Sequence, residues 1–206
     1  RFIQRRMDDQ LKDLRVKERC GTFTEEDNQI KEMLQQYGFL DIRHHMRKVI
    51  RAKEILRSEE FYEADKAEWA LNAFREVMEY ISAAYYPASI NFYPVESNLN
   101  VYRPWVSDDL LKASDDEKVN IYIDVCKQLV FPAVEKEQPG VIGISIGTPI
   151  QLMSGITFAK LLKQKYPQIH ITVGGNIITR LKDELAKKKK FFEQVFDSII
   201  CYEGEH

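Results

Sequence analysis

Residues suited to close contact with a ligand follow three short apolar runs in the last third of this 206-residue chain. Ser145 and Gly147 lie at the end of the first run, Gly174 and Gly175 follow the second, and the segment 203–205 (Glu-Gly-Glu) follows the third. Glycine has no Cβ, so a backbone at glycine can approach a bound group closely. The pattern indicates either a ligand-binding face or tight turns and close helix–sheet contacts. It indicates binding rather than catalysis, since the four histidines form no Ser/His/Asp set with a credible spacing.

The elements that would position these residues alternate between strand and helix from Gly140 onward. The run 141–146 is β-branched and apolar on both faces, which predicts a buried strand. Thr148 as N-cap and Pro149 in the first helical position predict the next helix. Strand, helix, strand, helix and strand are expected at 141–146, 149–166, 169–173, about 179–190 and 198–202. This order predicts a parallel α/β sheet, whose ligands lie beyond the carboxyl ends of the strands.

Several other kinds of site do not fit the sequence. Neither the dinucleotide pattern G-x-G-x-x-G nor a phosphate-loop lysine motif occurs at these turns. Asp197 precedes its strand, so it would lie at the wrong end for the phosphoacceptor of a receiver-like domain; a flavodoxin-like domain stays open. His170 is expected in the core or at a sheet edge. His44 and His45 are adjacent among basic residues, which favours a solvated basic face over a metal site.

The first 138 residues read as mostly helical. Thr24 predicts the start of a helix and Gly38 its end. The segment 114–117, in which three acidic residues follow Ser114, predicts a capping box. Pro132 is expected to kink or end a helix, and the lysines 187–190 to end another. The aromatic, proline-rich segment 86–105 is expected to be a packed connector or an aromatic wall of a site. A helical stripe is expected at Phe61, Ala64, Leu71, Phe74, Met78, Ile81 and Tyr85.

The composition restricts the class of protein. The net charge is −2, with 30% charged and 44% apolar residues, which argues against electrostatic capture of nucleic acid or an anionic membrane. No transmembrane run or signal peptide is visible. Cys20, Cys126 and Cys201 form neither a disulfide framework nor a zinc cluster, which favours a cytoplasmic location. Since the chain starts at Arg1 without methionine, we expect a piece of a longer protein.

The segments 139–145, 166–176 and 197–205 resemble the cobalamin-binding domain that precedes many radical-SAM domains. The family pattern is a serine turn followed, after one helix and one strand, by Gly-Gly, which corresponds here to Ser145 and to Gly174 with Gly175. The resemblance covers about residues 139–206. It implies a Rossmann-like α/β sheet of the cobalamin-binding type at 139–206, preceded by a mostly α-helical region or cover at 1–138.

The resemblance also implies roles for individual residues. Ser145 would hydrogen-bond the nucleotide tail of cobalamin, and Gly174 and Gly175 would let that tail pass between sheet and helix. The acidic loop 203–205 would face the rim of the corrinoid or lead into the next domain. Thr148 and Asn176 are polar neighbours by position. The expected cofactor-binding residues are Ser145, Gly147, Thr148, Gly174, Gly175, Asn176, Glu203, Gly204 and Glu205. No residue is expected to be catalytic or to bind a metal.

The parent protein implied by the resemblance is a radical-SAM enzyme, such as a methyltransferase or a magnesium-protoporphyrin monomethyl ester cyclase. S-adenosylmethionine and a four-iron four-sulfur cluster would bind in a downstream domain of the same polypeptide. The Cys-x-x-x-Cys-x-x-Cys motif that holds such a cluster is absent from this chain. This chain is therefore not expected to cleave S-adenosylmethionine, and its partners would be that domain and the cofactor.

Two departures from the family pattern favour an alternative. Gly147 stands where the pattern has leucine, and the window 98–103 has no histidine that would serve as a lower ligand of cobalt. The alternative is a cofactor-free, Rossmann-like docking or substrate-access domain of the same kind of enzyme. The first strand of a complete sheet is expected upstream of Arg1, with 89–93 as a candidate for an added strand.

Overall fold

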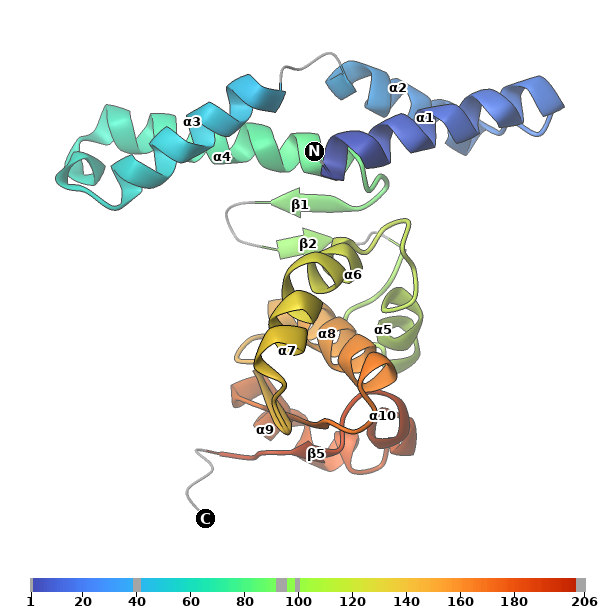
Figure 1. The fold of residues 1–206 in the computed structure, drawn as a ribbon, viewed down its shortest axis with the longest axis vertical. Coiled ribbons are helices and arrows are strands. Elements are labelled where there is room, and N and C mark those ends of the chain that lie inside the picture. Colours follow the sequence, from blue (N-terminus) through green and yellow to red (C-terminus); the bar gives the residue numbers. More distant parts are fainter. Residues whose placement is uncertain (1, 39–41, 92–95, 99–100, 203–206) are drawn as a thin grey trace. The chain divides into compact units, whose positions relative to one another are not determined.

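The structure, a computed structural model, describes residues 2–38, 42–91, 96–98 and 101–202. The chain divides into two compact units, Arg1–Asn100 and Val101–His206. The first unit consists of helices and a two-stranded hairpin, and the second is mixed α/β with a parallel sheet (Figure 1). A helical first part followed by a C-terminal part with a parallel sheet is therefore confirmed.

The first unit begins with a reciprocally capped helix pair. Thr24 and Asp27 cap the second helix, since Asp27 N–H donates to Thr24 Oγ1 (3.1 Å) and Thr24 N–H to Asp27 Oδ2 (3.0 Å). Lys17 donates to Asp27 Oδ1 at 2.5 Å, which ties the first helix to the second. The elements of this unit are α1 (Phe2–Cys20), α2 (Glu25–Gly38), α3 (Ile42–Leu56), the 3-10 turn η1 (Glu59–Tyr62), α4 (Ala64–Ala83), β1 (Ser89–Asn91) and β2 (Glu96–Asn98).

The face that the long helix α4 buries overlaps the predicted stripe only in part. Phe61 and Leu71, which belong to that stripe, are exposed. Ala52 and Ile55 of α3 instead pack against alanines of α4, whose small side chains permit a close approach of the two helices. The predicted stripe is therefore confirmed only in part, since Phe74 packs against this cluster and Tyr85 is buried, whereas Phe61 and Leu71 do not face the core. The buried residues of α4 are Ala70, Ala73, Tyr80 and Ala83.

The basic face of α3 is paired rather than simply solvated. His45 Nδ1 lies 3.2 Å from Glu76 Oε2, and Lys48 Nζ lies 2.9 Å from the same oxygen. The hydrogen bond from Lys48, assisted by the charge of His45, holds the pKa of Glu76 below its usual value. The part of the chain that the structure describes contains no group of three His, Cys, Asp or Glu side chains arranged to hold a metal ion.

The segment 89–93 does not extend the parallel sheet. Its described part, β1, pairs with β2 in an antiparallel hairpin, with Ile90 opposite Ser97. Ile90 N–H also donates to Ser82 Oγ at 2.8 Å, which attaches the hairpin to the end of α4. Because this local pairing uses the strand, the expectation of an added strand in the parallel sheet is wrong.

The second unit carries the predicted alternation of strands and helices. Thr148 has the extended backbone of an N-cap, and Pro149 opens the helical turn after β3, as predicted. A π-helical turn ends at Val130, two residues before Pro132, and the chain continues in helical conformation as α7, so Pro132 does not end the helix. Its elements are α5 (Ser107–Ala113), α6 (Ile121–Val125), the π turn (Cys126–Val130), α7 (Phe131–Glu137), β3 (Val141–Ser145), the 3-10 turn η3 (Pro149–Gln151), α8 (Leu152–Lys165), β4 (His170–Gly174), α9 (Asn176–Leu185), α10 (Lys189–Gln194) and β5 (Ser198–Ile199).

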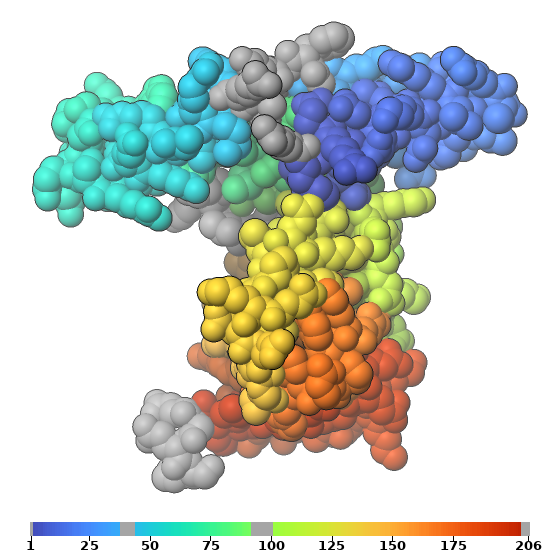
Figure 2. Space-filling view, in the orientation of Figure 1, coloured from blue at the N-terminus to red at the C-terminus, as the bar shows by residue number. Residues whose placement is uncertain are grey.

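Buried polar contacts join the helices before the sheet to α8. Asn120 and Thr157 are fully buried, and Asn120 Nδ2 donates to Thr157 Oγ1 at 2.9 Å. Lys160 Nζ donates to the carbonyl oxygen of Leu111 at 3.0 Å. Figure 2 shows the yellow atoms of α6 and α7 against the orange atoms of α8. The boundary expected after residue 138 thus falls inside this unit, because α5 and α6 pack on α8.

Two helix termini differ from the predictions. Ser114 caps the carboxyl end of α5, where its hydroxyl lies 2.8 Å from the Leu110 carbonyl oxygen, and α6 begins after Asn120, which accepts the Tyr122 N–H. The capping box predicted at 114–117 is wrong, since serine binds backbone groups at either end of a helix. The lysine run is also misplaced, because its last two residues open α10 instead of ending α9.

The parallel sheet has the strand order β3-β4-β5. Its register pairs Val141 with His170 at one end and Ser145 with Gly174 at the other. The helix α8 contacts both β3 and β4. Val141, Gly143 and Ser145 are exposed, so the expectation that this strand is buried on both faces is wrong. The reason is that α8 packs on the side of β3 that carries Ile144, whereas α9 contacts β4.

Candidate ligand-binding rim

The sheet brings the predicted serine and glycines to one edge. Ser145, the last residue of β3, pairs with Gly174, the last residue of β4. Ile146 N–H donates to the Gly174 carbonyl at 2.7 Å, and Ile200 N–H donates to that of Val173 at 2.8 Å. The carboxyl ends of the three strands therefore meet. We call this edge the carboxyl rim, and its residues are Ser145, Gly147, Thr148, Gly174, Gly175, Asn176 and Ile200.

Polar side chains of the carboxyl rim are open to solvent. Ser145, Thr148 and Asn176 are all exposed. Hydroxyl and carboxamide groups donate and accept hydrogen bonds without carrying charge, so this edge suits a ligand rich in polar, uncharged groups. Glu203, Gly204 and Glu205, which the sequence analysis assigns to the same edge, lie outside the described residues.

Gln151 organises the loop after β3, and the sequence analysis missed it. Its Oε1 accepts the N–H of Gly147 at 2.8 Å and that of Thr148 at 3.3 Å. These backbone donors are therefore used by the chain itself and do not form an anion site. The spacing from Thr148 to Gln151 is that of a capping box, a signal that would have identified this contact from the sequence.

The two glycines of the carboxyl rim face other parts of the chain. A Cβ at Gly174 would stand 3.2 Å from the carbonyl oxygen of Ile200 and 3.3 Å from its Cβ. Gly175 has φ +100°, and a Cβ there would stand 2.6 Å from the carbonyl oxygen of Ile146. Gly175 therefore makes a tight turn and a close backbone contact, which was the simpler of the two interpretations. Gly174 lies beneath a single residue.

The chain after β5 folds onto α9. Tyr202 N–H donates to Thr179 Oγ1 at 2.9 Å, and Lys182 Nζ donates to the Tyr202 hydroxyl at 2.8 Å. This hydrogen bond to Tyr202 is the main reason that the pKa of Lys182 is raised. Tyr202 has φ +61°, a left-handed conformation that is unusual for a residue with a side chain. The sequence analysis extended the third strand through Tyr202 and so missed these contacts.

Titratable groups of the sheet lie at its other end. His170 is level with Val141, and its Nε2 lies 2.8 Å from Ser198 Oγ. Asp197 accepts the Ile171 N–H at 2.8 Å and pairs with Lys163. Burial opposes ionisation of Asp197, but Lys163 and the Ile171 amide outweigh it and lower the pKa of the carboxyl group. Neither His170 nor Asp197 is available at the carboxyl rim.

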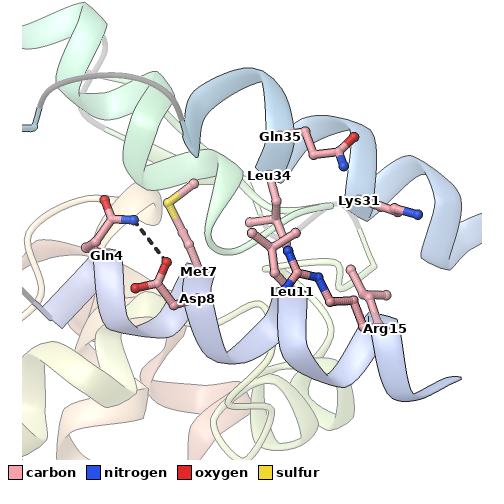
Figure 3. Close-up of a pocket in the computed structure, with 9 residues that line it drawn as sticks. Gln4, Met7, Asp8, Leu11, Arg15, Lys31, Leu34 and Gln35 are labelled. Atoms are coloured by element: carbon pink, nitrogen blue, oxygen red, sulfur yellow. Dashed lines mark hydrogen bonds between the residues drawn. The ribbon is translucent and has the colours of Figure 1, made fainter. Parts of the chain in front are cut away.

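Two cavities lie away from the carboxyl rim. The first, of about 220 Å³, lies between α1 and α2, where Met7, Leu11 and Leu34 point between the helices and Gln4 donates to Asp8 at 3.1 Å (Figure 3). The second, of about 500 Å³, includes Gly140 at the amino end of the sheet. The sequence analysis predicted neither cavity, because each is formed by residues of different elements that share no motif.

Comparison of the chain with known protein families, curated proteins and solved structures finds no relative. No family model matches the chain, and neither a curated protein nor a solved structure matches it. A search for membrane spans among the described residues finds no helix with both the length and the apolar character to cross a bilayer.

Proposed function

We propose that the α/β unit belongs to a Rossmann-like cobalamin-binding domain of a radical-SAM enzyme, a methyltransferase or a cyclase, and positions the corrinoid for a downstream iron–sulfur domain. The observation that carries the proposal is the register that sets Ser145 beside Gly174 at an exposed edge. Ligands of parallel α/β sheets bind beyond the carboxyl ends of the strands. The family resemblance of 139–206 supplies the identity of the ligand.

The residues of the carboxyl rim suit such a ligand. The exposed side chains of Ser145, Thr148 and Asn176 would hydrogen-bond the nucleotide tail, which carries hydroxyl and amide groups beside its phosphodiester. Gly174 has no side chain, so the space above it is available to the tail when Ile200 is displaced. Bound cobalamin supplies a cobalt centre that carries a methyl group or tunes radical chemistry, which side chains cannot do. The chain itself binds, orients and shields the cofactor.

The proposal assigns cobalt no histidine ligand from the described residues of this unit. His170 lies at the amino end of β4 and contacts Ser198, and it cannot face a group at the carboxyl rim. We therefore propose binding in the form without a protein lower ligand.

A second candidate is a cofactor-free docking or substrate-access domain. The contact of Gly175 with the Ile146 backbone favours it, because that glycine is fully accounted for by the fold. The use of Gln151 to satisfy the loop amides favours it as well. In this case the polar side chains of the carboxyl rim contact another domain instead of a small molecule.

Retention of hydroxocobalamin by the 206-residue chain tests the two candidates. The protein is mixed with hydroxocobalamin and desalted, and corrinoid absorbance is measured in the protein fraction. Cobalamin binding predicts retained absorbance, and Ser145→Trp should abolish it by blocking the carboxyl rim. Val141→Trp is the matched control, because Val141 is exposed on the same face of the same strand at the opposite end.

Two results would contradict cobalamin binding. One is no retention above background by protein whose circular dichroism shows it to be folded. The other is equal retention by the two tryptophan variants, which would place any bound corrinoid away from Ser145. The first result would favour the second candidate function, a cofactor-free docking or substrate-access domain, over cobalamin binding.

A further inference from the structure

We propose that Ile200, Cys201 and Tyr202 form a strap that closes over Gly174 and must open before a ligand reaches that glycine. The proposal deepens the function proposed above, on which its ligand step rests, whereas opening of the strap itself is independent of any ligand. The strap consists of described residues and has its own internal reporter, Cys201.

The strap is held by few contacts. β5 ends at Ile199, and the strap adds one backbone hydrogen bond to β4, from Ile200 N–H to the Val173 carbonyl. The Ile200 side chain does not anchor the strap in the core, since the residue is 46% exposed. Few buried apolar contacts and solvent-accessible backbone hydrogen bonds are the properties of segments that open locally.

A polar latch on α9 holds the far end of the strap. Thr179 Oγ1 accepts the Tyr202 N–H, and Lys182 Nζ both donates to the Tyr202 hydroxyl and lies 4.9 Å from the centre of its ring. Tyr202 is 70% exposed and has φ +61°, so its conformation depends on these contacts rather than on burial. Loss of the latch leaves little to keep Tyr202 in place.

Opening of the strap uncovers one glycine and not the other. Gly174 faces only Ile200, so its missing Cβ becomes open space when the strap moves. Gly175 rests on Ile146, which is fully buried and cannot move without disrupting the sheet. The strap therefore controls access to Gly174, whereas Gly175 maintains the turn in either state.

The thiol of Cys201 measures strap opening directly. Cys201 is half-buried in the strap, Cys20 is exposed, and Cys126 is buried with its pKa raised to about 11 by burial. In a Cys20→Ser background, a disulfide reagent such as DTNB should label Cys201 at a rate set by opening. Thr179→Val keeps the shape of residue 179 but removes the acceptor, and should speed labelling about fivefold, the effect of one lost hydrogen bond.

Lys182→Met and Lys187→Met provide a matched pair. Both remove one cation near the end of α9, but only Lys182 contacts Tyr202, whereas Lys187 pairs with Glu184. Faster labelling with Lys182→Met alone supports the strap. Unchanged labelling with both Thr179→Val and Lys182→Met overturns it, provided that Cys126 stays unreactive and the fold is intact.

Hydroxocobalamin separates this proposal from the function proposed above. If the ligand occupies Gly174, Cys201 should be labelled faster in the complex than in the free protein, since Ile200 is displaced. Latch variants that speed labelling in a protein that retains no corrinoid support the strap and contradict the cobalamin function. Retained corrinoid with labelling of Cys201 unchanged overturns the requirement that the strap opens for the ligand, and leaves cobalamin binding in place.

Discussion

Gly175 packs on the backbone of Ile146, the first residue after β3. A Cβ at residue 175 would stand 2.6 Å from the Ile146 carbonyl oxygen and 2.8 Å from its carbonyl carbon. The φ of Gly175 is +100°, so a side chain would also strain the backbone of residue 175 itself. This contact fixes the turn from β4 into α9 against the neighbouring strand end.

Gly175→Ala should lower the free energy of unfolding by about 2–4 kcal/mol, because strain and overpacking each contribute. Gly143→Ala is the control, since a Cβ there meets only Thr172 Cγ2 at 3.8 Å. That variant should change stability by less than about 0.5 kcal/mol. Urea denaturation of the two proteins measures the difference, and an equal effect of both substitutions would contradict the contact.

Lys160→Met should destabilise the second unit although it replaces a charged residue with an apolar one. Lys160 is only 4% exposed, and its Nζ serves both the Leu111 carbonyl (3.0 Å) and Asp115 Oδ2 (2.6 Å). Methionine preserves the packing of the stem but leaves these acceptors with one donor fewer, at a cost of about 1 kcal/mol. The exposed pair of Lys187 and Glu184 provides the comparison, and Lys187→Met should leave the denaturation midpoint unchanged.

Gln138→Gly should stabilise the protein. Gln138 follows α7 with φ 44° and ψ 54°, a left-handed conformation that glycine adopts without strain. The expected gain is about 1 kcal/mol in the free energy of unfolding. Gln168→Gly, at an exposed position whose φ is not positive, should give no gain. A stability ranking in which Gln168→Gly equals or exceeds Gln138→Gly would argue against strain at residue 138.

Tyr102 should make stability depend on pH in the alkaline range. Burial, together with donation of its hydroxyl to Asp116 Oδ2 at 2.8 Å, raises the pKa of Tyr102 from 10.0 to about 12. Folding therefore favours the protonated phenol, and this contribution is complete below pH 10 and is lost as the pH rises to about 12. Unfolding measured across this range should show a decline in stability that Tyr102→Phe reduces. Tyr62→Phe, at a tyrosine that is 80% exposed, should leave the decline as it is.

The strands of the sheet are predictable from the sequence because their signal is local. The β-branched run after Gly140 gives β3, and the one before Gly174 gives β4, each within one residue of the observed limits. The third strand is overextended to residue 202, because its end depends on the distant contact between Tyr202 and Thr179. A hydrophobic pattern contains no information about such a pairing.

The contacts and burial of individual side chains are harder to predict from the sequence than the strands. Gly174 and Gly175 were both identified, but glycine next to a ligand and glycine next to the chain's own backbone have the same sequence pattern. The sequence alone would place the charged Lys160 in solvent, on the polar side of its helix. It is buried because the end of α5 packs beside it, where the Leu111 carbonyl accepts its hydrogen bond. In α4, small alanines face α3 while Leu71 is exposed. A prediction that places the largest apolar side chains in the core therefore fails for these residues.

The buried contact between Asn120 and Thr157 determines how this protein can be dissected. A piece beginning at Pro139 would retain Thr157 but lose the carboxamide that satisfies its hydroxyl, and it would uncover the surface of α8 that α5 and α6 shield. Such a truncation should be poorly soluble however complete its sheet. The shortest fragment worth expressing for ligand studies starts ahead of Ser107, so that the interior of this unit is carried intact.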